Sequence, residues 1–373
     1  MSSIIPTPIA RQPWAMLTPL ILLTCFGAAV LYSAAGGKFS PFADTHLLRF
    51  AITMVMALII SAFPRDFVKL VAYPGYIGVL LLLVAVEAAG SLGGGSQRWL
   101  ELGPIRIQPS ELMKPAVCLA LARFYDTLPT GMIGSWRALL PAGVIIALPV
   151  LLVLMQPDLG TALAILFSGA VVMFLAGLPM SWFLGAGALG AVAVPLAYSF
   201  ALKPYQQRRV TTFLDPESDP LGSGYHITQS KIAIGSGGFS GKGFNEGSQS
   251  HLQYLPEPHT DFVFATMAEE WGFLGGLFVI VCFGLILAWG LSVARNAQNR
   301  FDRLLAAGMA ATMFFYIAIN LMMVMGMAPV VGIPLPFMSH GGSSMLTNMM
   351  CLGVLMMVYR WNTQRHGGGL LSS

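Results

Sequence analysis

Residues 254–292, YLPEPHTDFVFATMAEEWGFLGGLFVIVCFGLILAWGLS, decide the class of fold. The apolar run of residues 262–292 is long enough to cross a bilayer, whose hydrocarbon core needs roughly 20 residues of helix. Three carboxylates, Asp261, Glu269 and Glu270, lie at the edge of this run or within it. Ionisable side chains next to hydrocarbon are costly and usually functional. We therefore take these carboxylates as the first candidates for a functional site.

The rest of the chain repeats the apolar pattern. Of its 373 residues, 56% are hydrophobic and only 10% are charged, which excludes a soluble globular protein. Backbone amides in lipid must be satisfied within the segment, and no alternating barrel pattern occurs, so helices are expected. The sequence predicts an all-α bundle of about ten transmembrane helices, at residues 14–35, 47–63, 70–90, 110–126, 138–155, 159–177, 181–201, 262–292, 304–327 and 344–360.

The one long polar segment, residues 202–261, is expected to be a large extracytoplasmic loop between helices 7 and 8. It is too short and polar to hold its own core, so we expect it to pack on the bundle of a single membrane domain, residues 1–373. The four cysteines lie far apart in apolar runs and indicate neither a disulfide framework nor a thiolate metal site. The modest net charge of +4 gives no reason to expect a nucleic-acid partner.

Basic residues in the short loops indicate the orientation. With a cytoplasmic N-terminus, the inward gaps and the tail hold Arg65, Lys69, Arg137, Arg295, Arg300, Arg303, Arg360 and Arg365. Both termini are then cytoplasmic. The outer segments also carry cations, against the usual bias, and an anionic ligand at the outer surface would explain them. The candidates are Arg98, Arg106, Arg208, Arg209 and Lys242.

Asp261 follows His259 at the expected start of a helix on the outer face. It suits both the helix N-cap and a general base acting on a sugar or alcohol hydroxyl, and the two roles are compatible. Glu269 lies two turns deeper, where pairing of it or Glu270 with a buried cation is the expected role. Glu111 and Lys114, spaced i, i+3, are expected either to pair with each other or to brace Asp261 or a ligand phosphate.

Two glycine-rich runs lie at outer loops. GSGGFSGKG (235–243) lacks the phosphate-loop spacing, so it is interpreted as a flexible turn or as a presenter of N–H groups and Lys242 to a phosphate. HGGSS (340–344) places Ser343 among the supporting residues. The sequence gives no signal for a nucleotide, a haem or a structural zinc.

Several motifs together resemble one family. QRWLELGPIRIQPSELMKP (97–115), QPDLGTA (156–162), the segment 205–272 and GIPLPFMSHGGSS (332–344) are similar to the SEDS proteins of bacterial shape, elongation, division and sporulation. The segment YLPEPHTDFVF (254–264) resembles the elongation branch of this family more than the division branch. His340 departs from the family, where a tyrosine is expected before the glycine pair.

The resemblance implies a peptidoglycan glycosyltransferase that polymerises lipid II at the outer face of the bacterial cytoplasmic membrane. It puts the essential acid at Asp261 and outer-cavity residues at Glu111 and Lys114. It also implies a class B penicillin-binding protein (a PBP2-type transpeptidase) and other elongation-complex membrane proteins as partners, and an association with Mg2+ or Mn2+. Two other classes stay open: a lipid II flippase, which needs a polar path to the cytoplasm, and a non-catalytic scaffold.

Overall fold

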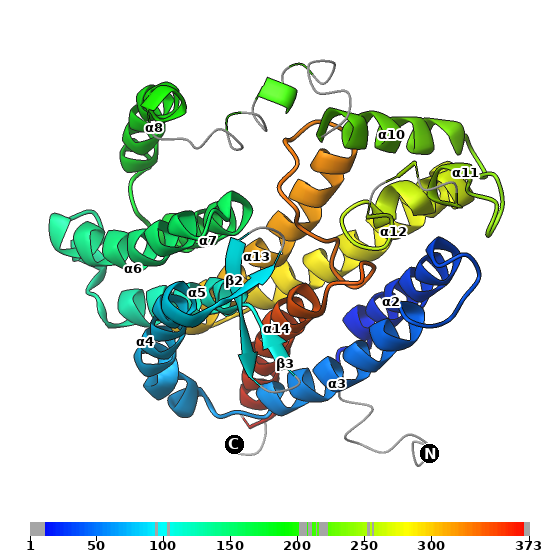
Figure 1. The fold of residues 1–373 in the computed structure, drawn as a ribbon. Coiled ribbons are helices and arrows are strands. Elements are labelled where there is room, and N and C mark those ends of the chain that lie inside the picture. Colours follow the sequence, from blue (N-terminus) through cyan, green and yellow to red (C-terminus); the bar gives the residue numbers. More distant parts are fainter. Residues whose placement is uncertain are drawn as a thin grey trace, which may run out of the picture.

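The computed structural model describes residues 12–93, 96–102, 105–200, 207, 211–213, 215, 223–251, 254–255 and 257–368. This part of the chain contains ten long helices, each overlapping one of the ten predicted segments; they pack into a bundle except α8, which stands at its edge (Figure 1). They are α2 (Trp14–Ala34), α3 (Ala43–Ser61), α4 (Arg65–Ala89), α5 (Pro109–Thr127), α6 (Trp136–Met155), α7 (Leu159–Ala176), α8 (Met180–Phe200), α12 (Val263–Arg295), α13 (Arg300–Val324) and α14 (Gly342–Gly368).

Smaller elements occupy the connections. A three-stranded antiparallel sheet, not predicted from the sequence, joins α4 to α5 through β1 (Ser91–Gly93), β2 (Ser96–Leu102) and β3 (Ile105–Ile107). The polar segment before α12 contains α10 (Ser223–Ser236) and α11 (Ser248–His251). α10 packs on α12 and α13. The packing of the whole segment 202–261 stays a prediction, because much of it lies outside the described residues.

The surface of α3 shows why the bundle belongs in a membrane. Leu48, Ile52, Val55 and Ile59 are each more than half exposed and share one face of the helix. The opposite face buries smaller or more polar side chains, His46, Thr53 and Ala57. This is the reverse of a helix in a soluble protein, which buries its large apolar face. Eight of the described helices are long and apolar enough to cross a bilayer. The predicted polytopic helical membrane fold is confirmed.

α3 and α14 pack together with small residues between them. A Cβ atom at Gly353 of α14 would lie 2.9 Å from the Cα atom of Ala57, so the backbones approach too closely for any larger residue. Small residues at such contacts are typical of membrane helices, where close backbone packing replaces the hydrophobic driving force.

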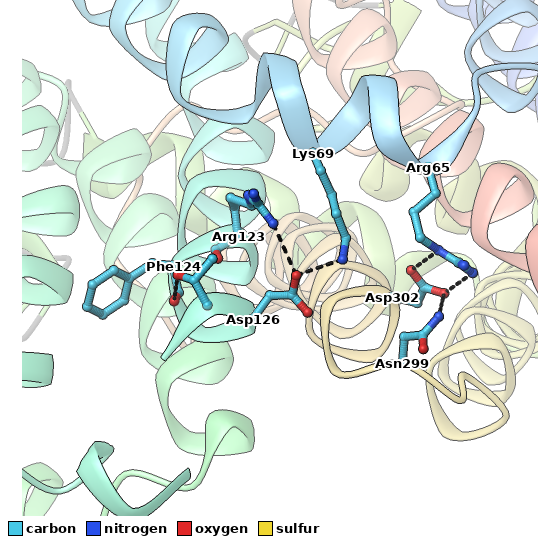
Figure 2. A network of polar contacts seen from close by, with 8 residues as sticks. Arg65, Lys69, Arg123, Phe124, Asp126, Asn299 and Asp302 are labelled. Carbon is cyan, nitrogen blue, oxygen red and sulfur yellow. Dashed lines mark hydrogen bonds and ion pairs between the residues drawn. The ribbon is translucent and has the colours of Figure 1, made fainter. Parts of the chain in front are cut away.

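Ion pairs connect the ends of several helices at one end of the bundle (Figure 2). Arg65, which begins α4, donates two hydrogen bonds to Asp302 in the first turn of α13, at 3.0 and 2.5 Å. Lys69 and Arg123 both contact Asp126 near the end of α5, at 2.7 and 3.2 Å. Helix ends from three parts of the chain therefore meet here. Asp261 precedes α12, whose other end leads into α13, so it lies at the opposite end of the bundle.

α12 is interrupted at Gly272, whose φ of 60° and ψ of −154° are not helical. Such a break leaves N–H and C=O groups on both sides without partners in the helix, and each must be satisfied elsewhere. The segment after α10 satisfies four of them. The bonds run from Phe273 N to Gly238 O (2.9 Å), Leu274 N to Phe239 O (3.2 Å), Lys242 N to Glu269 O (3.0 Å) and Gly243 N to Glu270 O (3.1 Å).

Glycine is required for this exchange. A Cβ atom at Gly241 would lie 2.0 Å from the carbonyl oxygen of Glu270, and one at Gly237 would lie 1.9 Å from that of Ala268. The run GSGGFSGKG is therefore packed backbone to backbone against the break in α12. Its observed role is structural, and irregular backbone near a membrane is tolerated in this way because protein groups satisfy it.

Candidate functional site

Asp261 lies in the turn before α12, but it is not the cap of that helix. The N-cap residue is Phe262, whose side chain makes no capping hydrogen bond, so Asp261 stands one residue before the predicted N-cap position. Asp261 is half-buried, and its backbone carbonyl accepts a 2.9 Å hydrogen bond from Nδ2 of Asn320 on α13. A Cβ atom at Gly332 would lie 3.5 Å from Oδ2 of Asp261. The carboxylate thus lies against the segment between α13 and α14.

Three aromatic or imidazole rings join the neighbouring loops. The backbone N–H of His340 donates to the backbone carbonyl of His259 at 2.8 Å, which connects the turn before α12 to the turn before α14. The ring of Phe42 stacks on His259 with centroids 4.1 Å apart. Arg49 Nη1 lies 3.1 Å from Nε2 of His340. Burial lowers the pKa of both histidines, and Arg49 lowers that of His340 further. Both rings are thus biased toward the neutral form.

Glu111 and Lys114 form the predicted pair. Lys114 is fully buried, and its Nζ lies 2.5 Å from Oε1 of Glu111. The hydroxyl of Tyr316 on α13 contacts both side chains. The pair therefore joins α5 to α13 in the interior, and its observed contacts are with protein groups. This arrangement favours support of the site over direct contact with a ligand phosphate.

Two of the predicted anion-binding cations are engaged by the protein. Arg98 on β2 donates hydrogen bonds to the carbonyls of Gln156 and Pro157 and lies 3.9 Å from Asp158. Lys242 lies 2.6 Å from Oε1 of Glu269. Arg98 therefore holds the turn before α7, and Lys242 neutralises a buried acid. These contacts give both side chains structural roles.

Of the two deeper acids, Glu269 forms an ion pair with Lys242, and Glu270 accepts a hydrogen bond from a neighbouring helix. Glu269 is fully buried and accepts hydrogen bonds from Lys242, from Ser248 Oγ at 3.0 Å and from the backbone N–H of Gln249 at 3.1 Å. Ser33 on α2 donates to Glu270, which is also buried. Both acids fix the first half of α12 to its surroundings.

Arg106 and Ser343 are the other predicted residues that the structure describes. Arg106 is exposed on β3, and Ser343 is half-buried in the first turn of α14. Next to Ser343, a Cβ atom at Gly342 would lie 3.5 Å from Cζ of Arg49. Arg208 and Arg209 lie outside the described residues.

Tyr316, Asn320 and Arg49 contact this site but were missed by sequence reasoning. Tyr316 and Asn320 are spaced i, i+4 in an otherwise apolar run, a spacing that puts both on one face of a helix. Arg49 is the one basic residue of the predicted second span. The sequence therefore shows each of them as a polar residue in an apolar segment, but it does not show which residues they contact.

The described residues also bear on metal binding. Within the described parts of the chain, no group of three or more His, Cys, Asp or Glu side chains converges. These residues do not form a cage for a resident ion. Mg2+ is commonly held by one or two carboxylates together with substrate phosphates, so this finding bears only on a cage formed by the protein alone.

Comparisons with known proteins agree with this architecture. Residues 13–364 match the family model of the FtsW, RodA and SpoVE cell cycle proteins. The chain is 43% identical to peptidoglycan glycosyltransferase MrdB of Escherichia coli over 92% of both sequences. It is 36% identical to stage V sporulation protein E of Bacillus subtilis over 93% of this chain and 96% of that protein.

Solved structures give the same result. A chain of a peptidoglycan synthase complex, described as coordinating polymerization and crosslinking, superimposes with a TM-score of 0.83 at 33% identity and covers 95% of this chain and 99% of that one. The Thermus thermophilus rod shape determining protein RodA gives a TM-score of 0.71 at 29% identity, covering 94% and 97%. The bundle, the buried acids and these similarities together show that the chain belongs to the FtsW, RodA and SpoVE family, the SEDS proteins.

Proposed function

We propose that this protein is a peptidoglycan glycosyltransferase that polymerises lipid II into glycan strands during cell elongation, with Asp261 as the general base. The names of its relatives support the activity, and the similarity to RodA and MrdB supports the elongation branch. The observation that carries the assignment of the base is the position of Asp261. It is a half-buried carboxylate at one end of a membrane bundle, with its backbone fixed by Asn320.

In the proposed reaction, Asp261 accepts the proton of the 4-hydroxyl of the acceptor N-acetylglucosamine. That oxygen attacks the anomeric carbon of the donor N-acetylmuramic acid, and a new glycosidic bond forms as the bond to the pyrophosphate breaks. Undecaprenyl pyrophosphate leaves with the bonding electrons, and the α-linkage becomes β. A carboxylate is suited to this role because it stays ionised at neutral pH and needs only hydrogen-bond reach of the hydroxyl.

Charge developing on the leaving pyrophosphate must be stabilised by cations. We assign this role to Arg208 and Arg209, with Arg106, which is exposed on β3. Mg2+ or Mn2+ bound with the substrate would add positive charge at the same phosphates.

The protein is a multi-pass protein of the bacterial inner membrane. We place the ionic end of the bundle, with Arg65, Lys69 and Arg123, in the cytoplasm, as the positive-inside rule favours. Both termini are then cytoplasmic and Asp261 faces outward, where lipid II is polymerised. A class B penicillin-binding protein is the proposed partner, supported by the similarity to a chain of a synthase complex that combines polymerization with crosslinking.

Transport of lipid II is less well supported by the buried polar groups. Near the outer end of the bundle, the buried polar groups are Glu111, Lys114 and Tyr316. One turn further along α13, Thr312 donates a hydrogen bond to Ser168 at 2.9 Å. Toward the other end, the same helices bury apolar side chains, Leu121 on α5 and Leu304 and Leu305 on α13. Among the described residues, the polar line therefore ends within the bundle.

Polymerisation of purified lipid II by the detergent-solubilised protein tests the proposal, because polymer formation needs no sealed compartment whereas transport does. Asp261→Asn should abolish strand synthesis while the protein stays folded. The matched control is Glu257→Gln, which removes a mostly exposed carboxylate from the same turn and should leave synthesis near the wild-type rate. Undiminished synthesis by Asp261→Asn would remove Asp261 from the mechanism, and no synthesis by the wild type would refute the activity.

A further inference from the structure

One face of α13 connects the parts of the site. Thr312, Tyr316 and Asn320 are spaced four residues apart, so they follow one another along the helix. Thr312 contacts Ser168 on α7, and Tyr316 contacts the buried Glu111–Lys114 pair. At the end of the same helix, the carbonyl of Val324 accepts a hydrogen bond from Ser230 of α10 at 2.7 Å. Asn320 lies along the helix between Tyr316 and Val324.

Asn320 is the member of this face that contacts the Asp261 turn. Its side chain is fully buried, and Nδ2 donates to the carbonyl of Asp261 at 2.9 Å and to that of Ile333 at 2.7 Å. Ile333 adjoins Gly332, the residue next to Oδ2 of Asp261. One amide group therefore holds together the segment that carries the carboxylate and the segment against which the carboxylate lies.

This geometry calls for a neutral group with two N–H donors. Both protons of Nδ2 are used, and a single planar group fixes the spacing between the two carbonyls. Leucine would leave both carbonyls without this donor, whereas aspartate, of nearly equal size, would put negative charge against both. Serine keeps one donor and so satisfies only one of the carbonyls.

We propose that Asn320 is a positioning residue for glycosyl transfer, which fixes the backbone of Asp261 against residues 332–333 so that the carboxylate meets the acceptor hydroxyl. The inference rests on the proposed function. Asn320 acts through Asp261, so its loss is expected in turnover more than in substrate binding. Misplacing a reacting group by about 1 Å lowers rates by roughly 100-fold.

The experiment compares Asn320→Leu with Asn348→Leu. Asn348 on α14 is also fully buried, but its amide donates to Ser344 of its own helix, at 2.8 Å. Both variants replace a buried amide by leucine, so Asn348→Leu controls for the loss of a buried polar group outside the Asp261 turn. Asn320→Asp and Asn320→Ser provide a near-isosteric replacement and a partial donor. We measure kcat and KM for lipid II polymerisation in detergent, together with the thermal unfolding temperature.

We expect Asn320→Leu and Asn320→Asp to lower kcat by roughly 100-fold with KM within about 3-fold of the wild type, and Asn320→Ser to lie between them and the wild type. Asn348→Leu should keep kcat within about 3-fold of the wild type, because its amide is bonded within α14. Equal kcat values for folded Asn320→Leu and Asn348→Leu, or a loss confined to KM, would overturn the inference. An inactive wild type would instead refute the proposed function itself.

Discussion

Replacement of Lys114 by methionine tests the buried pair between α5 and α13. Lys114 is fully buried, and its Nζ lies 2.5 Å from Glu111, whose side chain is only 10% exposed. Methionine keeps much of the volume but removes the countercharge, so the carboxylate of Glu111 stays in the interior unpaired. Breaking a buried pair in this way costs about 3–5 kcal/mol. Glu111→Gln/Lys114→Met removes both charges and should recover most of that loss.

The expected shift in melting temperature follows from the size of the chain. At about 2.1 cal/mol/K of unfolding entropy per residue, 373 residues give roughly 0.8 kcal/mol/K, so the single variant should melt about 4–6 °C below the wild type. Thermal unfolding of the purified protein in detergent measures this. The control is Arg123→Met, which breaks an i, i+3 pair on the same helix whose side chains are 30% and 19% exposed. A partly exposed pair contributes below about 1 kcal/mol, or roughly 1 °C.

The reasoning is refuted if Lys114→Met melts with the wild type, or if the double variant melts no higher than the single one. The first result would mean that the carboxylate of Glu111 is not dependent on Lys114 in the folded protein. The second would mean that packing around Lys114, rather than its charge, accounts for the loss.

Three further predictions concern the turns and the cation. Gly241→Ala places a Cβ atom 2.0 Å from the Glu270 carbonyl and should lower stability by about 3 kcal/mol, whereas Gly235→Ala, with open space around it, should be nearly neutral in the same melting assay. Burial and Arg49 lower the pKa of His340, so the unfolded chain binds more protons below about pH 6.5. Stability should therefore fall as the pH drops from that value through the lowered pKa, and His340→Asn should reduce the fall; an unchanged pH profile of melting would contradict this. EDTA should suppress polymerisation, and Mg2+ or Mn2+ should restore it, without any change in melting temperature; an EDTA-induced loss of stability would indicate a resident ion instead.

Much of the fold was predictable because a bilayer limits the alternatives. Every span must be a helix of roughly 20 apolar residues, so the apolar segments of the sequence indicated where the helices lie. α5 was the least clear of the ten, because Glu111, Lys114 and Arg123 interrupt its apolar run. The small sheet at residues 91–107 was not predicted, since its strands are short and lie in a loop.

The functional residues divide in the same way. The sequence by itself determined a polytopic membrane protein, its family, and Asp261 and the Glu111–Lys114 pair as candidates. Only the tertiary structure decided the partners. It assigned Lys242 to Glu269, Arg98 to the turn before α7, the glycine run to the break in α12, and Asn320 to the backbone of Asp261. The physical reason is that hydropathy is a property of each segment, whereas a hydrogen bond joins groups tens or hundreds of residues apart, whose meeting depends on how the helices pack.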